Sequence, residues 1–509
     1  MALRTNILAN YAGQAWMALM TVAFVPVYAK ALGYEAFGLV GVMLSLQAMS
    51  LLLDLGMGGV MNREMARRAT DPALAESMRN LTRTFEWLIW PVALLIALAL
   101  WLLAPWLVRH WLHPVELSEE QAVHAVRLMG IAVAAQWPSA FYVSGLSGLE
   151  RQPAANLVNA VFATLRGAGS VGVLYAISAT VNAFMEWQAL VGIAQSVVAA
   201  IVLRGALPKG PARFVGAEFL SAYRFAGGVL AITALSIALT QLDRLLLSAM
   251  RPLTDVGYFT IAITVAAGLG RLVQPVFNAT YPRFSRLVAT GDLDTLAGLY
   301  RDTSQYLLIV VAAATGVLLA FPESLLYLWT ADARTANVVA VPMSLLILGT
   351  FLNGIMNLPY ALQLAHGWTR LSVGLNAVSL LASAAIGIPL VARDGVVGAA
   401  WLWLITNVIL VVVGLPLMHR RLMRGQLKTW ILESIGPPIL AAATCSAVLA
   451  LVLPPIGRSV IGLMQLGLIV AIVLTATTLS LPLGRRRLKG IVRTAKRVLQ
   501  RSTLRSNDP

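Results

Sequence analysis

Residues 86–108 read EWLIWPVALLIALALWLLAPWLV, an apolar block whose single charge, Glu86, stands at its first position. A helix needs about 20 such residues to cross the hydrocarbon core of a bilayer. The whole chain of 509 residues is 59% hydrophobic and only 12% charged, against about 45–50% and about 25% in average globular proteins. Its mean hydropathy is +0.78. The composition excludes a soluble protein and predicts an all-α, polytopic integral membrane protein.

Fourteen apolar blocks of this kind follow one another, separated by charges or turn signals. The first block is too long for the core of a signal peptide, so we expect it to remain as a transmembrane helix. The fourteen expected spans are 7–29, 37–60, 86–108, 122–147, 155–177, 183–203, 221–243, 255–281, 303–322, 336–359, 369–391, 396–418, 430–453 and 459–481.

The basic residues predict the orientation of the chain. With the N-terminus in the cytoplasm, 28 of the 38 lysines and arginines fall in cytoplasmic segments and 7 in outside loops. This is the distribution that the positive-inside rule describes. Both termini are therefore expected in the cytoplasm, and the net charge of +16 is attributed to cytoplasmic loops rather than to nucleic-acid binding. The tail, residues 484–509, is expected to form a basic amphipathic helix on the anionic inner leaflet.

A faint internal repeat predicts how the helices are grouped. Leu32–Gly38 follows the first block and Leu253–Phe259 the seventh, and each is a tight outside turn with a glycine that opens the next helix. Asp394–Ala400 repeats the pattern after the eleventh block. We expect a six-helix lobe over 1–204, a second over 205–424, an extra helix pair over 425–483 and the tail over 484–509. Paired repeats with a binding site between them are a common transporter design.

Arginines inside the apolar blocks are the leading candidates for binding residues. A charge at bilayer depth costs about 3 kcal/mol on insertion scales, so it normally faces a partner or a wet cavity. Arg166 and Arg271 lie deepest, with apolar residues on both sides. We expect both to line a cavity, where planar guanidinium groups suit an anionic ligand such as phosphate or carboxylate.

The other intramembrane charges each have a structural alternative. Asp54 precedes a glycine-rich segment and can either cap exposed backbone there or contact substrate. Arg127 lies near a block end and can extend to the surface. Asp243 and Arg244 are adjacent near an outside boundary, where a structural and a functional role are equally favoured.

Few residues suggest catalysis or metal binding. The sequence contains neither a phosphate-binding loop of the Walker type nor an H-E-x-x-H motif, and Cys445 is its single cysteine. His110, His113 and Glu116 lie close together, but an intervening proline breaks the helix that would align them, so we interpret them as interfacial polar residues. No cofactor, metal or nucleic-acid partner is expected. The outside loops are too short to carry the acid and base groups of an enzyme, so we do not expect one.

Several motifs, in order along most of the chain, carry a resemblance. They are Phe24–Gly38, Leu53–Gly58, Asn62–Glu64, Gln241–Ser248, Val256–Phe259, Arg271–Pro275, Tyr281–Arg286 and Asp394–Ala400. Together they resemble the polysaccharide-biosynthesis flippases, which are O-antigen and exopolysaccharide lipid-carrier translocases of the multidrug/oligosaccharidyl-lipid/polysaccharide exporter superfamily.

This resemblance implies two six-helix lobes around a central cavity, plus two further helices. It implies a polyprenyl-pyrophosphate-linked oligosaccharide as substrate, flipped outward across a bacterial inner membrane. Membrane lipids and the polysaccharide polymerase and export machinery are the partners it implies. Arg271 matches an eighth-helix arginine that is frequent in the family, whereas the uncharged first block lacks the arginines of lipid II flippases. Two alternatives stay open: a cation-coupled multidrug exporter of the same superfamily, and a membrane glycosyltransferase or polymerase acting on lipid-linked sugars.

Overall fold

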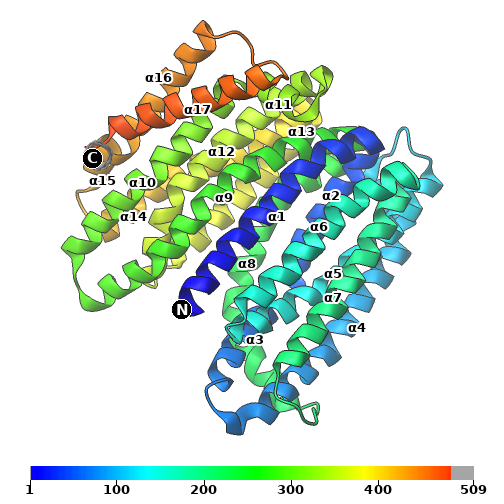
Figure 1. Cartoon of the computed structure of the whole chain (residues 1–509). Helices are drawn as coiled ribbons and strands as arrows, with labels where there is room; N and C mark the ends of the chain where they lie inside the picture. The colour runs from blue at the N-terminus through cyan, green and yellow to red at the C-terminus, as the bar shows by residue number, and fades with distance from the viewer. Residues whose placement is uncertain (1, 55, 483–509) are drawn as a thin grey trace, which may run out of the picture. The chain divides into compact units, whose positions relative to one another are not determined.

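The computed structural model describes residues 2–54 and 56–482, and all regular secondary structure among them is helical (Figure 1). A helix pairs its own backbone N–H and C=O groups, which would find no hydrogen-bond partner in lipid. Within the described residues, ten helical segments are long and apolar enough to cross a membrane. The prediction of an all-α, polytopic membrane protein is confirmed. The predicted basic tail, 484–509, lies outside the described residues.

The helices follow one another with short connections. In chain order they are α1 (Ala2–Leu32), α2 (Tyr34–Leu53), α3 (Met57–Arg68), α4 (Ala75–Leu107), α5 (Glu119–Gly148), α6 (Gln152–Ala176), α7 (Val181–Ala206), α8 (Gly216–Met250), α9 (Leu253–Thr290), α10 (Leu293–Ala320), α11 (Pro322–Thr330), α12 (Ala333–Ala365), α13 (Arg370–Ile409), α14 (Leu415–Leu422), α15 (Leu427–Trp430), α16 (Gly436–Val452) and α17 (Val460–Ser480). Single π-helical turns extend α4 at Val108–Leu112, lead into α14 at Leu410–Gly414 and join α15 to α16 at Ile431–Ile435.

Two predicted boundaries differ from the structure. The block at 37–60 is not one helix, because α2 ends at Leu53 and α3 begins at Met57, after Gly56 in the left-handed conformation (φ 76°). That backbone conformation favours glycine and stops the α2 helix. The short helix α11 lies in a segment that was expected to be a loop. The helix α13 covers parts of the two predicted blocks at 369–391 and 396–418. It bends between them at Gly395 (φ 54°), so the predicted boundary agrees with the structure there.

The chain forms two compact units. The first contains Met1–Thr264 and Leu380–Leu402, and the second contains Val265–Ser379 and Trp403–Pro509, so α9 contributes to both. The two units are defined by which residues pack together, whereas the predicted division into lobes at 204 and 424 was based on the repeat in the sequence. The division into lobes stays a prediction.

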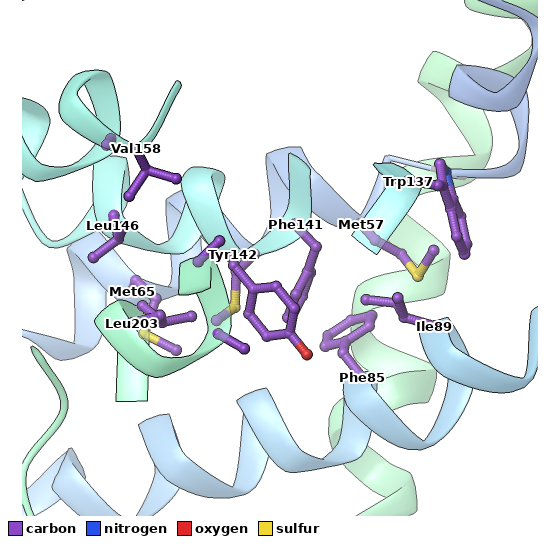
Figure 2. Close-up of a cluster of buried hydrophobic side chains, with 14 of the residues drawn as sticks. Met57, Met65, Phe85, Ile89, Trp137, Phe141, Tyr142, Leu146, Val158 and Leu203 are labelled. Atoms are coloured by element: carbon purple, nitrogen blue, oxygen red, sulfur yellow. The ribbon is translucent and has the colours of Figure 1, made fainter. Parts of the chain in front are cut away.

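In the first unit, α4, α5 and α7 lie side by side around a hydrophobic core (Figure 1). Figure 2 shows Met65 of α3, Phe85 of α4, Phe141 and Tyr142 of α5, and Leu203 of α7 meeting in this core. All five side chains are fully buried. This packing fixes the register of the helices that carry several of the charged groups described below.

The two repeated turn motifs pack against each other within the first unit. A Cβ atom added at Gly38 would lie closer than 3.0 Å to the carbonyl oxygen of Leu253, and one added at Gly257 would meet the carbonyl oxygen of Tyr34 equally closely. The Tyr34 and Tyr258 rings lie 4.7 Å apart at the same crossing. The glycines recur in both motifs because the starts of α2 and α9 touch backbone to backbone, where no side chain fits.

Glu35, in the first of these motifs, anchors the connection that precedes α5. Its carboxylate accepts hydrogen bonds from the backbone N–H groups of Val115 (2.7 Å), Glu116 (2.7 Å) and Leu117 (3.2 Å). Glu35 is only 2% exposed, and three charge-assisted bonds offset the cost of burying its charge. The connection is thereby held against the start of α2.

Candidate functional site

A polar stripe runs along α9 within the second unit. Arg271, Gln274, Asn278 and Tyr281 follow one another at intervals of three or four residues, which places them on one face of the helix. All four side chains are exposed, and the Gln274 amide donates to Asn278 Oδ1 at 3.1 Å. We call these four residues the Arg271 face. An exposed polar stripe in an apolar span is suited to line water or a polar ligand rather than lipid.

Aromatic side chains flank the Arg271 face. The Phe277 ring stacks on the Tyr281 ring at 5.8 Å and on the Tyr360 ring of α12 at 6.3 Å. Asn357, one helical turn before Tyr360, has a buried Oδ1 atom without a hydrogen-bond partner. Together these groups offer a cation, amide donors and acceptors, and flat apolar rings. Such a surface can bind a ligand that combines an anion with hydroxyl groups.

Arg271 itself is available for a ligand. In the part of the chain that the structure describes, no hydrogen bond or ion pair engages its guanidinium group. A guanidinium group has five N–H donors in a fixed plane and suits phosphate or carboxylate oxygens. The exposed position of Arg271 agrees with its expected role; whether it binds substrate stays a prediction.

Arg166 lies inside the first unit, among α1, α6 and α7. Its Nη2 donates to Gln195 Oε1 on α7 at 2.7 Å, while its Nε is buried without a partner. Tyr28 of α1 donates to the Gly167 carbonyl at 2.8 Å beside it. The structure therefore places Arg166 in a polar cluster within the first unit, whereas Arg271 belongs to the second unit.

Arg127 and Asp54 have local partners. Arg127, on α5, donates from Nε to the Trp101 carbonyl at 3.4 Å, and its guanidinium lies 5.1 Å from the Trp101 ring centroid. Asp54 accepts from the Gly58 N–H through both carboxylate oxygens, at 3.1 and 3.3 Å. This is the capping geometry expected for its structural alternative, because Asp54 satisfies a free N–H at the start of α3.

Asp243 is buried on α8, and the neighbouring Arg244 is partly buried. The Arg244 backbone N–H donates to Asp243 Oδ1 at 2.7 Å, whereas Asp243 Oδ2 and Arg244 Nε are buried without partners. Four residues further along, Ser248 accepts a hydrogen bond from the Trp111 indole at 3.0 Å, which ties α8 to the end of α4. Both charges are enclosed within the first unit, and no described contact assigns them a ligand.

An ionic network on α4, α5 and α7 was not predicted from the sequence. Glu86 is 4% exposed and forms ion pairs with Arg204 (2.7 Å) and Arg83 (3.5 Å). Tyr142 donates to the same carboxylate at 3.2 Å and accepts from the Trp90 indole at 3.0 Å. Glu86 and Arg204 both stand at block ends, where charge was interpreted only as a boundary signal. Their spacing of 118 residues along the chain gave no indication of contact.

The fold is shared with solved membrane proteins. It is similar to an inward-facing multidrug resistance MATE family transporter of the MOP superfamily, with a TM-score of 0.66, 15% identity and coverage of 81% of this chain and 96% of the other. It is also similar to the lipid II flippase MurJ in an inward closed conformation, with a TM-score of 0.65, 13% identity and coverage of 93% and 98%. These two likenesses show the fold, and the ten candidate spans make the chain a multi-pass membrane protein.

Sequence comparison gives the family. A family model described as "Polysaccharide biosynthesis protein" matches residues 3–288, more than half of the chain, and the chain belongs to this family. A curated relative, the "Putative O-antigen transporter" of Shigella flexneri, is 21% identical over 408 residues, which cover 79% of this chain and 94% of the relative. The resemblance read from the sequence motifs is confirmed.

Proposed function

We propose that this protein flips a polyprenyl-pyrophosphate-linked oligosaccharide, a repeat unit of O-antigen, capsule or exopolysaccharide, from the cytoplasmic to the outer face of a bacterial inner membrane. The proposal rests on the Arg271 face, where an unpaired guanidinium, two amides and aromatic rings lie on an exposed stripe of an apolar helix. The family and the O-antigen relative support this substrate class. Both termini lie in the cytoplasm in this proposal.

The residues of the Arg271 face have distinct roles in this proposal. Arg271 binds the pyrophosphate, because a guanidinium donates two parallel hydrogen bonds to phosphate oxygens. Gln274 and Asn278 bind sugar hydroxyls, and the Phe277–Tyr281 stack packs against a sugar ring. Arg166, whose Nε lacks a partner, is a separate candidate donor to an anion within the first unit. Asp54 and Arg127 act structurally in this proposal, since Asp54 caps α3 and the Arg127 guanidinium packs on the Trp101 ring.

Flipping needs such a surface for a physical reason. An unaided lipid-linked sugar would have to lose the water bound to its hydroxyl and pyrophosphate groups in the hydrocarbon core. Polar groups of the protein replace that water, while the polyprenyl chain stays in lipid. Alternating exposure of the bound headgroup to the two sides then completes transport. The protein acts as a transporter and not as an enzyme in this account.

The test is translocation in proteoliposomes that contain the purified protein and a fluorescent polyprenyl-pyrophosphate oligosaccharide. Arg271→Gln should slow flipping at least about tenfold, because it removes a charge-assisted contact with the anion. Arg286→Gln is the matched control, since Arg286 lies on the same helix about 22 Å further along and outside the Arg271 face. Equal rates for the wild type and Arg271→Gln would refute the site.

The same liposomes distinguish the multidrug exporter, which the MATE fold similarity favours as the second candidate. An exporter would move an organic cation in exchange for an ion that runs down an imposed gradient, and Arg271→Gln would not weaken this transport, because a guanidinium repels a cation. Cation transport without movement of the lipid-linked sugar would reject the flippase.

A further inference from the structure

An exposed apolar face of α4 has the dimensions of a bilayer core. Trp87, Leu94, Leu98, Leu102 and Trp106 along it are all at least half exposed. The 19 helical steps from Trp87 to Trp106 rise about 28 Å, close to the roughly 30 Å of hydrocarbon in a bilayer. Tryptophans at both ends match the interfacial aromatic belts. This face of α4 is therefore suited to contact lipid.

Arg83 lies one helical turn beyond Trp87, about 6 Å closer to the helix start. This places its guanidinium at the depth of the lipid headgroups. The side chain of Arg83 is 46% exposed, and its guanidinium lies 5.8 Å from the Trp87 ring centroid. Arg83 thus ends the lipid-facing stripe of α4 at the predicted cytoplasmic side.

A second lipid-facing stripe, on α7, ends in the same way. Leu190, Ile193, Val197 and Ile201 are exposed at intervals of three or four residues, and Arg204 follows three residues later with its side chain 55% exposed. The helix α7 runs opposite to α4, because the two arginines meet at Glu86 at one end of both helices. Two apolar stripes therefore lead to one pair of arginines, Arg83 and Arg204.

The Arg83–Arg204 pair has unused capacity for an anion. Both guanidiniums share the single carboxylate of Glu86, where Arg204 uses Nε and Nη2, and Arg83 uses Nη1. One negative charge against two positive charges leaves a net charge of +1. Each guanidinium has five N–H donors, so further donors remain on both exposed side chains. Arg79, by contrast, is engaged with the carbonyl groups of Pro208 and Pro211.

Tyr142 fixes the Glu86 carboxylate between Arg83 and Arg204, and Trp90 in turn holds the Tyr142 hydroxyl. The Tyr142 hydroxyl points toward α4 and Phe85 in the buried core (Figure 2), and it donates to Glu86 at 3.2 Å. Glu86 is thus fixed from the protein side, while the two arginines face outward from it. The two cations lie at the ends of the lipid-facing stripes of α4 and α7.

We propose that the Arg83–Arg204 pair binds the phosphate of an anionic phospholipid in the leaflet at the predicted cytoplasmic side. The headgroup phosphate accepts hydrogen bonds from both guanidiniums, and the acyl chains lie along the exposed stripes of α4 and α7. The net positive charge selects an anionic lipid over a zwitterionic one. This site is separate from the Arg271 face and does not depend on the flippase function.

The experiment is native mass spectrometry of the full-length protein with added phosphatidylglycerol or phosphatidylcholine. The wild type should bind phosphatidylglycerol about tenfold more tightly, and Arg83→Gln should remove most of that preference. Arg83→Lys, which keeps the charge but not the planar donors, should retain an intermediate preference. Arg67→Gln is the control, because Arg67 is an exposed arginine of α3 that is paired with Glu64 outside both stripes.

Two results would overturn the proposal. One is equal binding of the two lipids to the wild type, and the other is an undiminished preference in Arg83→Gln. Arg83 is half exposed and its ion pair is long, so Arg83→Gln should fold; its thermal midpoint is measured beside that of Arg67→Gln. Inorganic phosphate is added as a competitor, and complete displacement of phosphatidylglycerol at equal concentration would assign the pair to a soluble anion and reject the lipid.

Discussion

Gly257→Ala tests the crossing of α2 and α9 at the repeated turn motifs. The new methyl group would fall on the carbonyl oxygen of Tyr34, well inside any ordinary contact distance. The obstructing atom is a backbone oxygen of α2, so no side-chain rotation can make room for the methyl group. The Tyr34–Tyr258 ring contact and the Gly38–Leu253 contact, on either side, resist a shift of the helices.

The expected magnitude follows from two opposing effects. Overpacking of a tight contact costs typically about 1–3 kcal/mol and occasionally more. A glycine-to-alanine change within a helix recovers about 0.5–1 kcal/mol of backbone entropy. Because the obstacle is backbone, we expect the overpacking cost to dominate, with a net destabilisation of about 1–2 kcal/mol.

Gly268→Ala is a matched control on the same helix. An added Cβ atom at Gly268 meets nothing within 4 Å, so only the gain in helix propensity applies. Thermal unfolding of the purified proteins in detergent should give a lower midpoint for Gly257→Ala and an equal or higher midpoint for Gly268→Ala. If Gly257→Ala were as stable as Gly268→Ala, the close backbone contact of α2 and α9 would be refuted.

Two further substitutions test local anchors. Glu35→Gln should destabilise the protein by about 1–3 kcal/mol, because it replaces a buried charge that accepts three backbone hydrogen bonds. The amide hydrogens of residues 113–118 should then exchange faster. The control Glu119→Gln removes an exposed ion pair and should change the exchange little. Equal exchange in both variants would contradict the anchor. Asp54→Ala should lower the free energy of unfolding by about 0.5–2 kcal/mol through loss of the α3 cap, while the flipping rate per folded molecule stays unchanged. Loss of flipping at normal stability would instead indicate that Asp54 contacts substrate.

Much of the fold could be predicted because a bilayer constrains the chain so strongly. Apolar blocks of about 20 residues leave the helix as the available spanning structure. The break at Gly56 was indicated in the sequence by Asp54 and the glycines that follow it, but the apolar block at 37–60 was still predicted as one span. The helix α11 was missed because its nine residues are too few to form a span.

The candidate site could be predicted only in part. Arg271 was identifiable as a charge inside an apolar block, and the residues that share its helix face follow from helical periodicity. The partners of Arg166 and Arg127 could not be predicted, because Gln195 and Trp101 lie on other helices. Glu86 was overlooked because Arg204 reaches it only when α4 and α7 pack on α5, although its pair with Arg83, three residues away on α4, is local.

The most direct test of the central claim compares two fluorescent substrates in the same proteoliposomes. One carries the oligosaccharide on polyprenyl pyrophosphate, and the other carries the same oligosaccharide on an uncharged lipid. The account predicts that the wild type flips the pyrophosphate-linked substrate faster and that Arg271→Gln abolishes this advantage, because the guanidinium acts on the anion. Equal flipping of both substrates, or an advantage that survives in Arg271→Gln, would contradict it.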